Sequence, residues 1–286
     1  MSDRSDKKIP ALRPLREIMA AHDLRAKKGF GQNFLLDANI TDKIARTAGI
    51  EGRHVIEVGP GPGGLTRSLL DAGAEKVTAI EVDDRVIPIL SEYQSAYGPE
   101  RLDIIHADAL ELDVTALGHD IAIVANLPYN IATPLLIHWL KTMYNKPGCL
   151  AAMTLMFQRE VGQRIIASPG NKHYGRLAIL TQWLCNCSRA FDLPPSAFTP
   201  PPKVVSSVIQ FHPRSLDTAK EPRFETVEKL TSLAFGQRRK MIRSTLAPIR
   251  DILLENDINP TLRAENIDTS TYISLARIID KRNLEL

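Results

Sequence analysis

Short apolar runs alternate with amphipathic segments between residue 54 and about residue 160. The runs cover residues 55–58, 77–82, 103–105, 121–125 and 150–157, and the first four are rich in valine and isoleucine. We interpret each run as a buried strand, because its short length, and in the first four its β-branched content, distinguishes it from a buried helix. Strands that alternate with helices are typical of a mostly parallel sheet with helices on both faces. The pattern therefore predicts an α/β fold.

Helical spacing of apolar residues links these strands. We expect helices over residues 38–49, 84–97, 158–166 and 176–183. Another helix is expected to begin at Pro134, since proline is favoured in the first turn of a helix. Asp37 or Asn39 is expected to cap the first of these helices, because a short polar side chain can accept from the first free backbone N–H groups.

The ends of the chain have other patterns. Residues 204–211 alternate between apolar and polar, which predicts a strand that pairs antiparallel with residues 185–191 at the sheet edge. Beyond about residue 215 apolar residues recur only at helical spacing. Helices are expected over residues 224–235, 240–246, 262–264 and 271–279. We expect an N-terminal extension, an α/β domain and a helical domain, with bounds 1–24, 25–214 and 215–286. The extension is expected to be disordered over residues 1–10 and to hold a short helix at 14–23.

A glycine-rich turn at residues 59–64 follows the first strand and opens a helix. Glycine allows a ligand to approach the backbone, with bare N–H groups facing it, because a Cβ atom would block the approach. Glu81 follows the turn by about twenty residues, where a carboxylate can accept both hydroxyls of a ribose. Asp108 and Asn126 follow the third and fourth strands, at the edge where open parallel sheets bind ligands. The alternative is a tight turn that binds nothing.

The loop at residues 25–37 contains three basic residues, two glycines and two phenylalanines. Gln32 and Asn33 stand beside apolar Phe34 and Leu35, which suits a lid over a small ligand. A linker whose phenylalanines merely pack is the alternative.

Composition narrows the class of protein. The chain has 286 residues, 44% hydrophobic and 24% charged, which is ordinary for a soluble globular protein. It has neither an apolar run near the ~20 residues of a membrane helix nor the apolar segment of a secretory signal, so we expect a cytoplasmic protein without membrane contact. Cys149, Cys185 and Cys187 fit neither a disulfide framework nor a zinc site, so we expect reduced thiols and no metal.

Charge is segregated along the chain, although the formal net charge is only +3. Residues 51–150 contain 7 Lys and Arg against 14 Asp and Glu. Residues 1–30 contain 8 against 4, and residues 195–250 contain 10 against 4. An acidic centre between basic ends suggests that the ends contact a polyanion, and an ordinary solvated surface explains the counts about as well.

Two adenosine-containing cofactors fit the first half, a nicotinamide dinucleotide and S-adenosylmethionine, because both use a glycine turn and a ribose-binding carboxylate. The segment Asn-Leu-Pro-Tyr at residues 126–129 separates them. Hydride transfer needs a proton relay, such as Tyr-x-x-x-Lys or a catalytic His, and neither is evident at a strand end. Methylation of an amino group conjugated to a ring needs acceptors for its N–H groups instead, because the nitrogen lone pair is delocalised.

Residues 126–129 supply what this methylation needs. The Asn126 amide oxygen and the Leu127 carbonyl would accept hydrogen bonds from the amine and favour a tetrahedral nitrogen. Pro128 would fix the turn, and Tyr129 would offer a face on which the base stacks. Preorganised acceptors and alignment with the methyl group supply most of such catalysis, so no strong general base is required.

The segment 126–129 resembles the Asn/Asp-Pro-Pro-Tyr motif of amino-methyltransferases. Further motifs accompany it: Gly-Gln-Asn-Phe-Leu at 31–35, Glu-Val-Gly-Pro-Gly at 57–61, Tyr-Gly-Arg at 174–176, Phe-Thr-Pro-Pro-Pro-Lys-Val at 198–204 and Phe-Gly-Gln-Arg-Arg-Lys at 235–240. The six motifs follow one another as in the small-subunit (16S) ribosomal RNA adenine N6,N6-dimethyltransferase family. The chain strongly resembles that family from residue 25, where its basic loop begins, to its end.

The resemblance implies a Rossmann-like, seven-stranded class I methyltransferase domain that depends on S-adenosylmethionine, with a small C-terminal all-helical domain. It implies methyl transfer from S-adenosylmethionine, with S-adenosylhomocysteine as product and no metal. The acceptors would be N6 atoms of two adjacent adenosines in a hairpin loop near the 3′ end of small-subunit rRNA, in an immature 30S-type particle. We expect a monomer, since no dimer seam is visible.

Roles of single residues also follow from the resemblance. It assigns cofactor contacts to Asn33, Leu35, Gly59, Gly61, Glu81, Asp108 and Asn126. Gly59 would lie by the methionine part, Glu81 at the ribose and Asp108 at the adenine amino group. It assigns the target base to Asn126, Leu127, Pro128, Tyr129 and Phe198, and RNA phosphates to Arg238, Arg239, Lys240 and Arg243. Ordinary surface, capping or packing roles remain the alternatives for the carboxylates, the aromatic rings and the basic run.

Three rival functions remain open. A large-subunit rRNA adenine methyltransferase of the macrolide-resistance type resembles the chain through its cofactor half. A non-catalytic RNA-binding factor of ribosome assembly or transcription could retain the same fold. A nicotinamide-dependent oxidoreductase would bind a dinucleotide and have no affinity for RNA.

Overall fold

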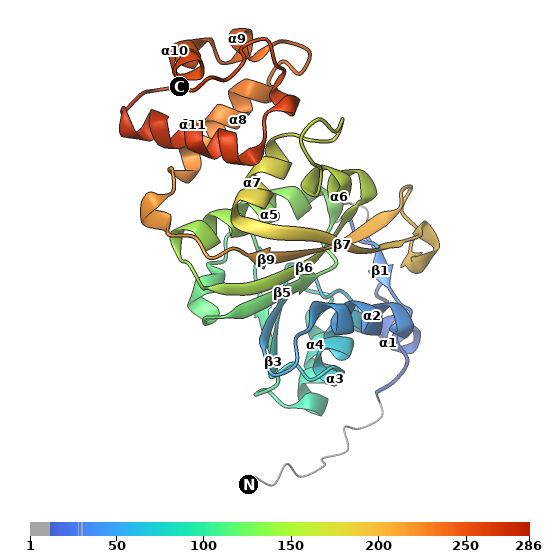
Figure 1. Ribbon diagram of the computed structural model, residues 1–286. Helices are drawn as coiled ribbons and strands as arrows, with labels where there is room; N and C mark the ends of the chain where they lie inside the picture. The colour runs from blue at the N-terminus through green and yellow to red at the C-terminus, as the bar shows by residue number, and fades with distance from the viewer. Residues whose placement is uncertain (1–11, 28, 30) are drawn as a thin grey trace.

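Seven strands form one sheet in the computed structural model, which describes residues 12–27, 29 and 31–286 (Figure 1). The strands are β2 (His54–Val58), β3 (Lys76–Glu81), β4 (Leu102–His106), β5 (Ile121–Ala125), β6 (Leu150–Gln158), β7 (Cys185–Leu193) and β9 (Ser206–Pro213). Their order is β4-β3-β2-β5-β6-β9-β7, and the first five are mutually parallel. β9 runs antiparallel to both β6 and β7, as the sequence predicts for the edge pair.

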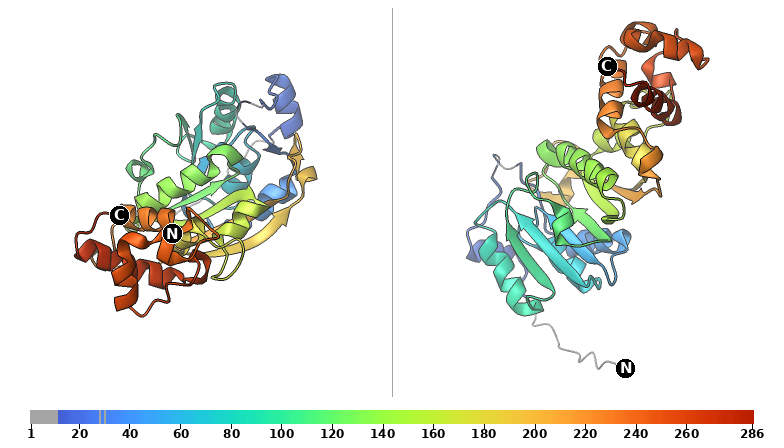
Figure 2. Two further views of the ribbon diagram at one scale, coloured as in Figure 1. Left: turned by 90° about the horizontal axis from the view of Figure 1, so that it is seen from above. Right: turned by 90° about the vertical axis from the view of Figure 1, so that its left-hand side faces the viewer.

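Helices cover both faces of the sheet, as Figure 2 shows. One face packs on α2 (Ala38–Ala48), α3 (Gly64–Asp71) and α4 (Ile87–Tyr97), and the other on α5 (Tyr129–Asn145), α6 (Arg159–Ile165) and α7 (Arg176–Leu184). Successive strand residues point to opposite faces, so Val55 lies in one core and Ile56 in the other. The Asp37 side chain caps α2 by accepting from the Asn39 N–H at 2.9 Å.

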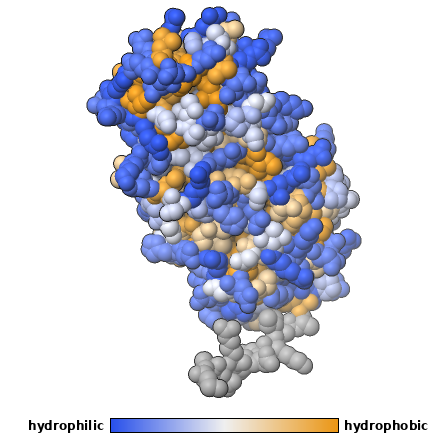
Figure 3. All heavy atoms as spheres, in the orientation of Figure 1, coloured by the Kyte–Doolittle hydropathy of each residue, from blue (hydrophilic) through white to orange (hydrophobic). Residues whose placement is uncertain are grey.

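The chain ends in four helices stacked beyond α7, namely α8 (Phe224–Phe235), α9 (Ile242–Thr245), α10 (Arg250–Glu255) and α11 (Thr269–Lys281) (Figure 1). They share one apolar core with α5 and α7, where the rings of Trp183 and Phe224 stack with centroids 5.9 Å apart. Figure 3 shows apolar atoms gathered on the outer surface of these helices, and Leu254 in α10 is 52% exposed. Helix α10 was not among the helices predicted from the sequence. The boundary at residue 215 stays a prediction, because the core runs across it.

Part of the N-terminal extension packs on the sheet domain. Its helix α1 (Leu15–Ala21) buries Ile18 in the core beneath α2, α3 and α4, and Leu24 follows it there. The disorder predicted for residues 1–10 lies outside the described residues.

The structure differs from the sequence prediction at several local points. The helix expected over residues 262–264 is absent, and a short 3-10 helix lies at Ala264–Asn266. The helix expected to begin at Pro134 begins at Tyr129, because Pro128 already holds the φ of −56° with which a helix starts, and Pro134 lies inside α5. A small two-stranded sheet, β1 (Phe34–Leu35) with β8 (Phe198–Thr199), was not expected at all. Each of these strands has only two residues, which is too short to show a periodic pattern, so the sequence could not reveal this pair.

The glycine turn yields a stability prediction. Gly63 has a φ of +80°, and a Cβ atom there would lie 2.2 Å from the Tyr93 ring, whose hydroxyl is held by the Pro62 carbonyl at 2.8 Å. We expect Gly63→Ala to lower the free energy of unfolding by about 1–3 kcal/mol more than Gly49→Ala does, because overpacking adds to the backbone cost. Gly49 has a φ of +61° with nothing within 4 Å of the added atom, so it is a matched control. Chemical denaturation measures both variants, and equal losses would show that Tyr93 yields freely.

Candidate active site

A cavity opens at the carboxyl ends of β2, β3 and β5, beneath the loop that precedes β1. Every predicted cofactor residue lines it: Asn33, Leu35, Gly59, Gly61, Glu81, Asp108 and Asn126. Leu127, Pro128 and Tyr129 line it as well. The structure therefore brings these residues together from segments far apart in the sequence, although their individual roles stay predictions.

The glycine turn shapes the cavity without offering the bare N–H groups that the sequence analysis expected. Gly59 donates to the Ile80 carbonyl at 2.9 Å, Gly63 to the Pro60 carbonyl at 3.0 Å, and Gly61 to the Glu81 carboxylate at 3.2 Å. That expectation is wrong for these three glycines, because buried amides are bonded within the fold. The contribution of the turn is that a ligand can approach its backbone closely, because glycine has no side chain.

Glu81 is 5% exposed at the end of β3. Its Oε1 accepts from the N–H groups of Val82 and Asp83, both at 2.9 Å, and its Oε2 accepts from Gly61. Burial raises the pKa of Glu81, and the three backbone N–H groups oppose that rise. A carboxylate has about four acceptor sites, so about one remains for a ligand's hydroxyl group.

Asn126 and Tyr129 are both held by hydrogen bonds. The Asn126 Nδ2 donates to the Asn33 carbonyl at 3.0 Å, which leaves the side-chain oxygen as the acceptor for a ligand. The Tyr129 hydroxyl lies 2.6 Å from the Ser206 Oγ, which fixes its ring at the start of α5. A second hollow, lined by Gly31, Asn33, Tyr129, Asn130, Phe157 and Gln158 among others, adjoins the cavity at these residues. The geometry therefore provides a small-ligand cavity and a neighbouring hollow, with Tyr129 on the wall of both.

Comparison with known proteins decides the family. The model of the ribosomal RNA adenine dimethylase family matches residues 23–281. The ribosomal RNA small subunit methyltransferase A of Sinorhizobium medicae is 51% identical over 275 residues, which cover 95% of this chain and 99% of the relative. The relative of that name in Rhodospirillum rubrum is 50% identical over 274 residues, 94% and 93% of the two chains. The chain belongs to the ribosomal RNA adenine dimethylase family. The family predicted from the six motifs is thereby confirmed.

Solved structures confirm the predicted class I methyltransferase fold. A dimethyladenosine transferase from Plasmodium falciparum has a TM-score of 0.74 at 24% identity, with 87% of this chain and 98% of that chain covered. The 23S rRNA methyltransferase ErmE has a TM-score of 0.65 at 24% identity, with 87% and 100% covered. At this identity the likeness concerns the fold alone.

Two residues that line the cavity, Glu57 and Val82, were missed by sequence reasoning. Glu57 lines the cavity at 1% exposure and accepts from the Thr66 hydroxyl at 2.6 Å. Burial raises the pKa of Glu57 to about 8, so the carboxyl is protonated at neutral pH. An acidic residue inside the apolar run Val-Ile-Glu-Val was the available signal. Val82 also lines the cavity while 51% exposed, an apolar surface at its mouth.

The other predicted substrate residues, Phe198 and the four basic residues of the α8–α9 region, do not line the cavity. Phe198 is 3% exposed and packs in the core as part of β8, so its stacking role stays a prediction. Arg238 donates to Glu265 at 2.8 Å and also to the Lys172 carbonyl. Arg239, Lys240 and Arg243 are exposed around the start of α9. These three are therefore better placed than Arg238 to meet a phosphate.

Two absences concern metal and membrane. Within the described ranges, no cluster of three or more His, Cys, Asp or Glu side chains is suited to a metal ion. Among the residues that the structure describes, no helix has both the length and the hydropathy of a bilayer span.

The buried carboxyl yields a prediction about pH. Glu57 keeps its proton up to about pH 8 in the folded state and loses it near pH 4.5 when unfolded. Its contribution to stability is therefore full below 4.5 and declines up to pH 8, by about 1.4 kcal/mol per pH unit at most. Glu57→Gln cannot titrate, so we expect its free energy of unfolding to rise relative to the native protein between pH 5 and 8. Denaturation at several pH values measures this, with exposed Glu75→Gln as control. A constant difference across that range would show that Glu57 does not titrate as described.

Proposed function

We propose that the protein transfers methyl groups from S-adenosylmethionine to N6 of two adjacent adenosines near the 3′ end of small-subunit (16S) rRNA, giving dimethyladenosines. The family match and relatives at 51% and 50% identity, named as small-subunit rRNA methyltransferases, support the reaction and the substrate class. The observation that carries the chemistry is residues 126–129 on the cavity wall, with the Asn126 amide oriented by the Asn33 carbonyl.

The cavity fits the cofactor by the chemistry of its walls. Glu81 supplies carboxylate acceptors for the ribose hydroxyls, and Asp108 supplies one for the adenine amino group. Gly59 lines the cavity without a side chain and leaves room along the turn for the methionine part. The bound cofactor supplies a methyl group on a positively charged sulfonium.

The chain's own residues prepare the amine. In the first transfer the two N–H groups of the adenine N6 donate to the Asn126 oxygen and the Leu127 carbonyl, and in the second transfer the one remaining N–H donates to one of these acceptors. This favours a tetrahedral nitrogen with its lone pair directed at the methyl group, and the proton that N6 loses in each transfer passes to water. Because Asn126 is fixed before the substrate arrives, little reorganisation is needed. Tyr129, fixed by Ser206, stacks on the base, whose ring enters through the hollow beside Asn130. The rate enhancement comes from the alignment of N6 with the methyl group and from the hydrogen bonds by which Asn126 and Leu127 stabilise the positive charge that develops on N6.

The wider setting of the reaction follows from the same proposal. The exposed cations Arg239, Lys240 and Arg243 contact RNA phosphates, which makes binding dependent on salt. The substrate is an immature 30S-type particle in the cytoplasm, and the enzyme acts as a monomer. The division into residues 1–24, 25–214 and 215–286 assigns RNA binding to the last part.

The rivals have less support. The large-subunit enzyme ErmE shares the fold, whereas relatives at about half identity carry the small-subunit name. A non-catalytic factor would not need the complete wall of acceptors that residues 126–129 and Glu81 form. A dinucleotide-dependent oxidoreductase disagrees with the family.

Asn126→Ala tests the proposed chemistry. We expect methyl transfer to small-subunit rRNA to fall about 100-fold or more, since a preorganised acceptor is lost. RNA affinity, measured by filter binding, should stay within about threefold because phosphate contacts dominate it. Asn145→Ala, at the exposed far end of α5, is the matched control and should keep its activity. Full activity of Asn126→Ala would remove the amide from the mechanism.

Arg239→Gln tests the proposed RNA surface. We expect the slope of log affinity against log salt concentration to decrease by about one, the value for one lost phosphate contact. Arg46→Gln removes the same charge from the exposed side of α2 and should leave the slope unchanged. If both variants kept the native slope, the α8–α9 turn would lie outside the RNA interface.

A further inference from the structure

Asp83 is a buried charge that the proposed mechanism does not use. It follows β3, two residues beyond Glu81, and its side chain is 0% exposed. Its own backbone N–H donates to the Glu81 Oε1 at 2.9 Å. A carboxylate fully removed from water requires charged or hydrogen-bonding partners, so its surroundings indicate what it holds in place.

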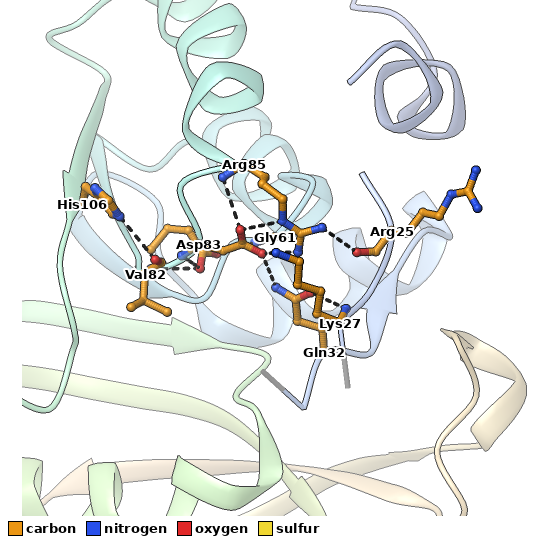
Figure 4. Close-up of polar contacts among 9 residues, drawn as sticks. Arg25, Lys27, Gln32, Gly61, Val82, Asp83, Arg85 and His106 are labelled. Atoms are coloured by element: carbon orange, nitrogen blue, oxygen red, sulfur yellow. Dashed lines mark hydrogen bonds and ion pairs between the residues drawn. The ribbon is translucent and has the colours of Figure 1, made fainter. Parts of the chain in front are cut away.

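The partners of Asp83 reach it from two directions, as Figure 4 shows. Arg85 forms a two-point contact, Nε to Oδ1 at 2.9 Å and NH2 to Oδ2 at 2.6 Å. The Gln32 Nε2 donates to Oδ2 at 2.9 Å from the loop that covers the cavity. Burial alone would raise the pKa of Asp83, but these hydrogen bonds outweigh it and the pKa lies below its usual value. The carboxylate therefore stays charged while it holds the loop.

The same cluster fixes the loop at further points. The remaining guanidinium nitrogen of Arg85, NH1, donates to the Arg25 carbonyl at 3.1 Å. The Gln32 Oε1 accepts from the Lys27 N–H at 2.9 Å, so both ends of this amide are used (Figure 4). The loop that begins at Arg25 is thus attached to the end of β3 through one arginine and one glutamine.

The held loop also orients the amide that faces the target amine. Asn33 follows Gln32, and its carbonyl accepts from the Asn126 Nδ2 at 3.0 Å. A shift of Gln32 would move that carbonyl and release the amide, which could then turn its NH2 group toward the amine. An amide turned in this way presents a donor where an acceptor is needed. Contacts therefore run without a gap from Glu81 through Asp83 and Gln32 to Asn126.

We propose that Asp83 is a positioning residue that couples the ribose end of the cofactor site to the amide that receives the target amine, with Gln32 as the link. This inference rests on the proposed function for its kinetic consequence, while the attachment of the loop is independent of it. The coupling predicts that breaking the Asp83–Gln32 bond loosens the loop and slows methyl transfer together.

A charge-conserving exchange tests the link. In Asp83→Asn the Arg85 guanidinium loses its charged partner. In Gln32→Glu the new carboxylate lies against the carboxylate of Asp83. The double variant has the native net charge and restores one donor and one acceptor in reversed order. Asp84→Asn removes the same charge from the exposed neighbouring residue and is the matched control.

The single-turnover rate of methyl transfer is measured at saturating cofactor and rRNA. It is divided by the concentration of protein that binds S-adenosylhomocysteine, so that misfolded protein does not lower the rate. We expect each single variant to be about tenfold slower or more, the double variant to recover at least fivefold over the slower single variant, and Asp84→Asn to stay within twofold. Limited trypsin digestion, followed by mass spectrometry, reports the loop directly. Cleavage after Arg25 and Lys27 should accelerate in the single variants and slow again in the double variant.

Other outcomes would overturn the inference. Native rates and native cleavage in both single variants would show that the bond holds nothing. Slower transfer that the double variant fails to relieve, with a matching fall in unfolding temperature, would assign Asp83 a general structural role. If the native protein methylated no rRNA, the proposed function would fail, and the cleavage pattern would still decide whether Asp83 holds the loop.

Discussion

The parallel pairing of β2 with β3 on one side and β5 on the other is the constraint on which the site depends. Val58 pairs with Ile80 across β2 and β3, and Ile56 pairs with Ile123 across β2 and β5. In this register the three strands end at one edge of the sheet. The glycine turn, Glu81 and Asn126 each follow one of these strands, so they meet around one cavity although long helices separate them in the sequence. The loop before β1 then closes the cavity from above.

Three acidic side chains lie buried beside that cavity, and each is stabilised differently. Glu57 is protonated, because its burial outweighs the opposing hydrogen bond from the Thr66 hydroxyl. Glu81 is held by three backbone N–H groups, which leaves acceptor capacity for a ligand. Asp83 is paired with Arg85 and holds the loop. The site thereby offers hydrogen-bond acceptors without accumulating unpaired negative charge in its interior.

Much of this arrangement could be predicted from the sequence. Apolar runs located the strands, and polar residues at their carboxyl ends located the cavity, because parallel strands bring those ends together. What could not be predicted depends on contacts between distant residues. The pairing of Phe34 with Thr199, the bond from Gln32 to Asp83 and the pairing of Arg238 with Glu265 have no local signal. The start of α5 at Tyr129 was missed for a different reason, since Pro134 is a favourable but not obligatory first-turn residue.

The most direct test of the account is methyl transfer from labelled S-adenosylmethionine into undermethylated small ribosomal subunits, with large-subunit rRNA alongside and nucleoside analysis of both. We predict N6,N6-dimethyladenosine in the small-subunit rRNA and none in the large-subunit rRNA. Label confined to large-subunit rRNA would contradict the proposed substrate. Binding of small subunits without any transfer would contradict the proposed reaction and favour a non-catalytic assembly factor.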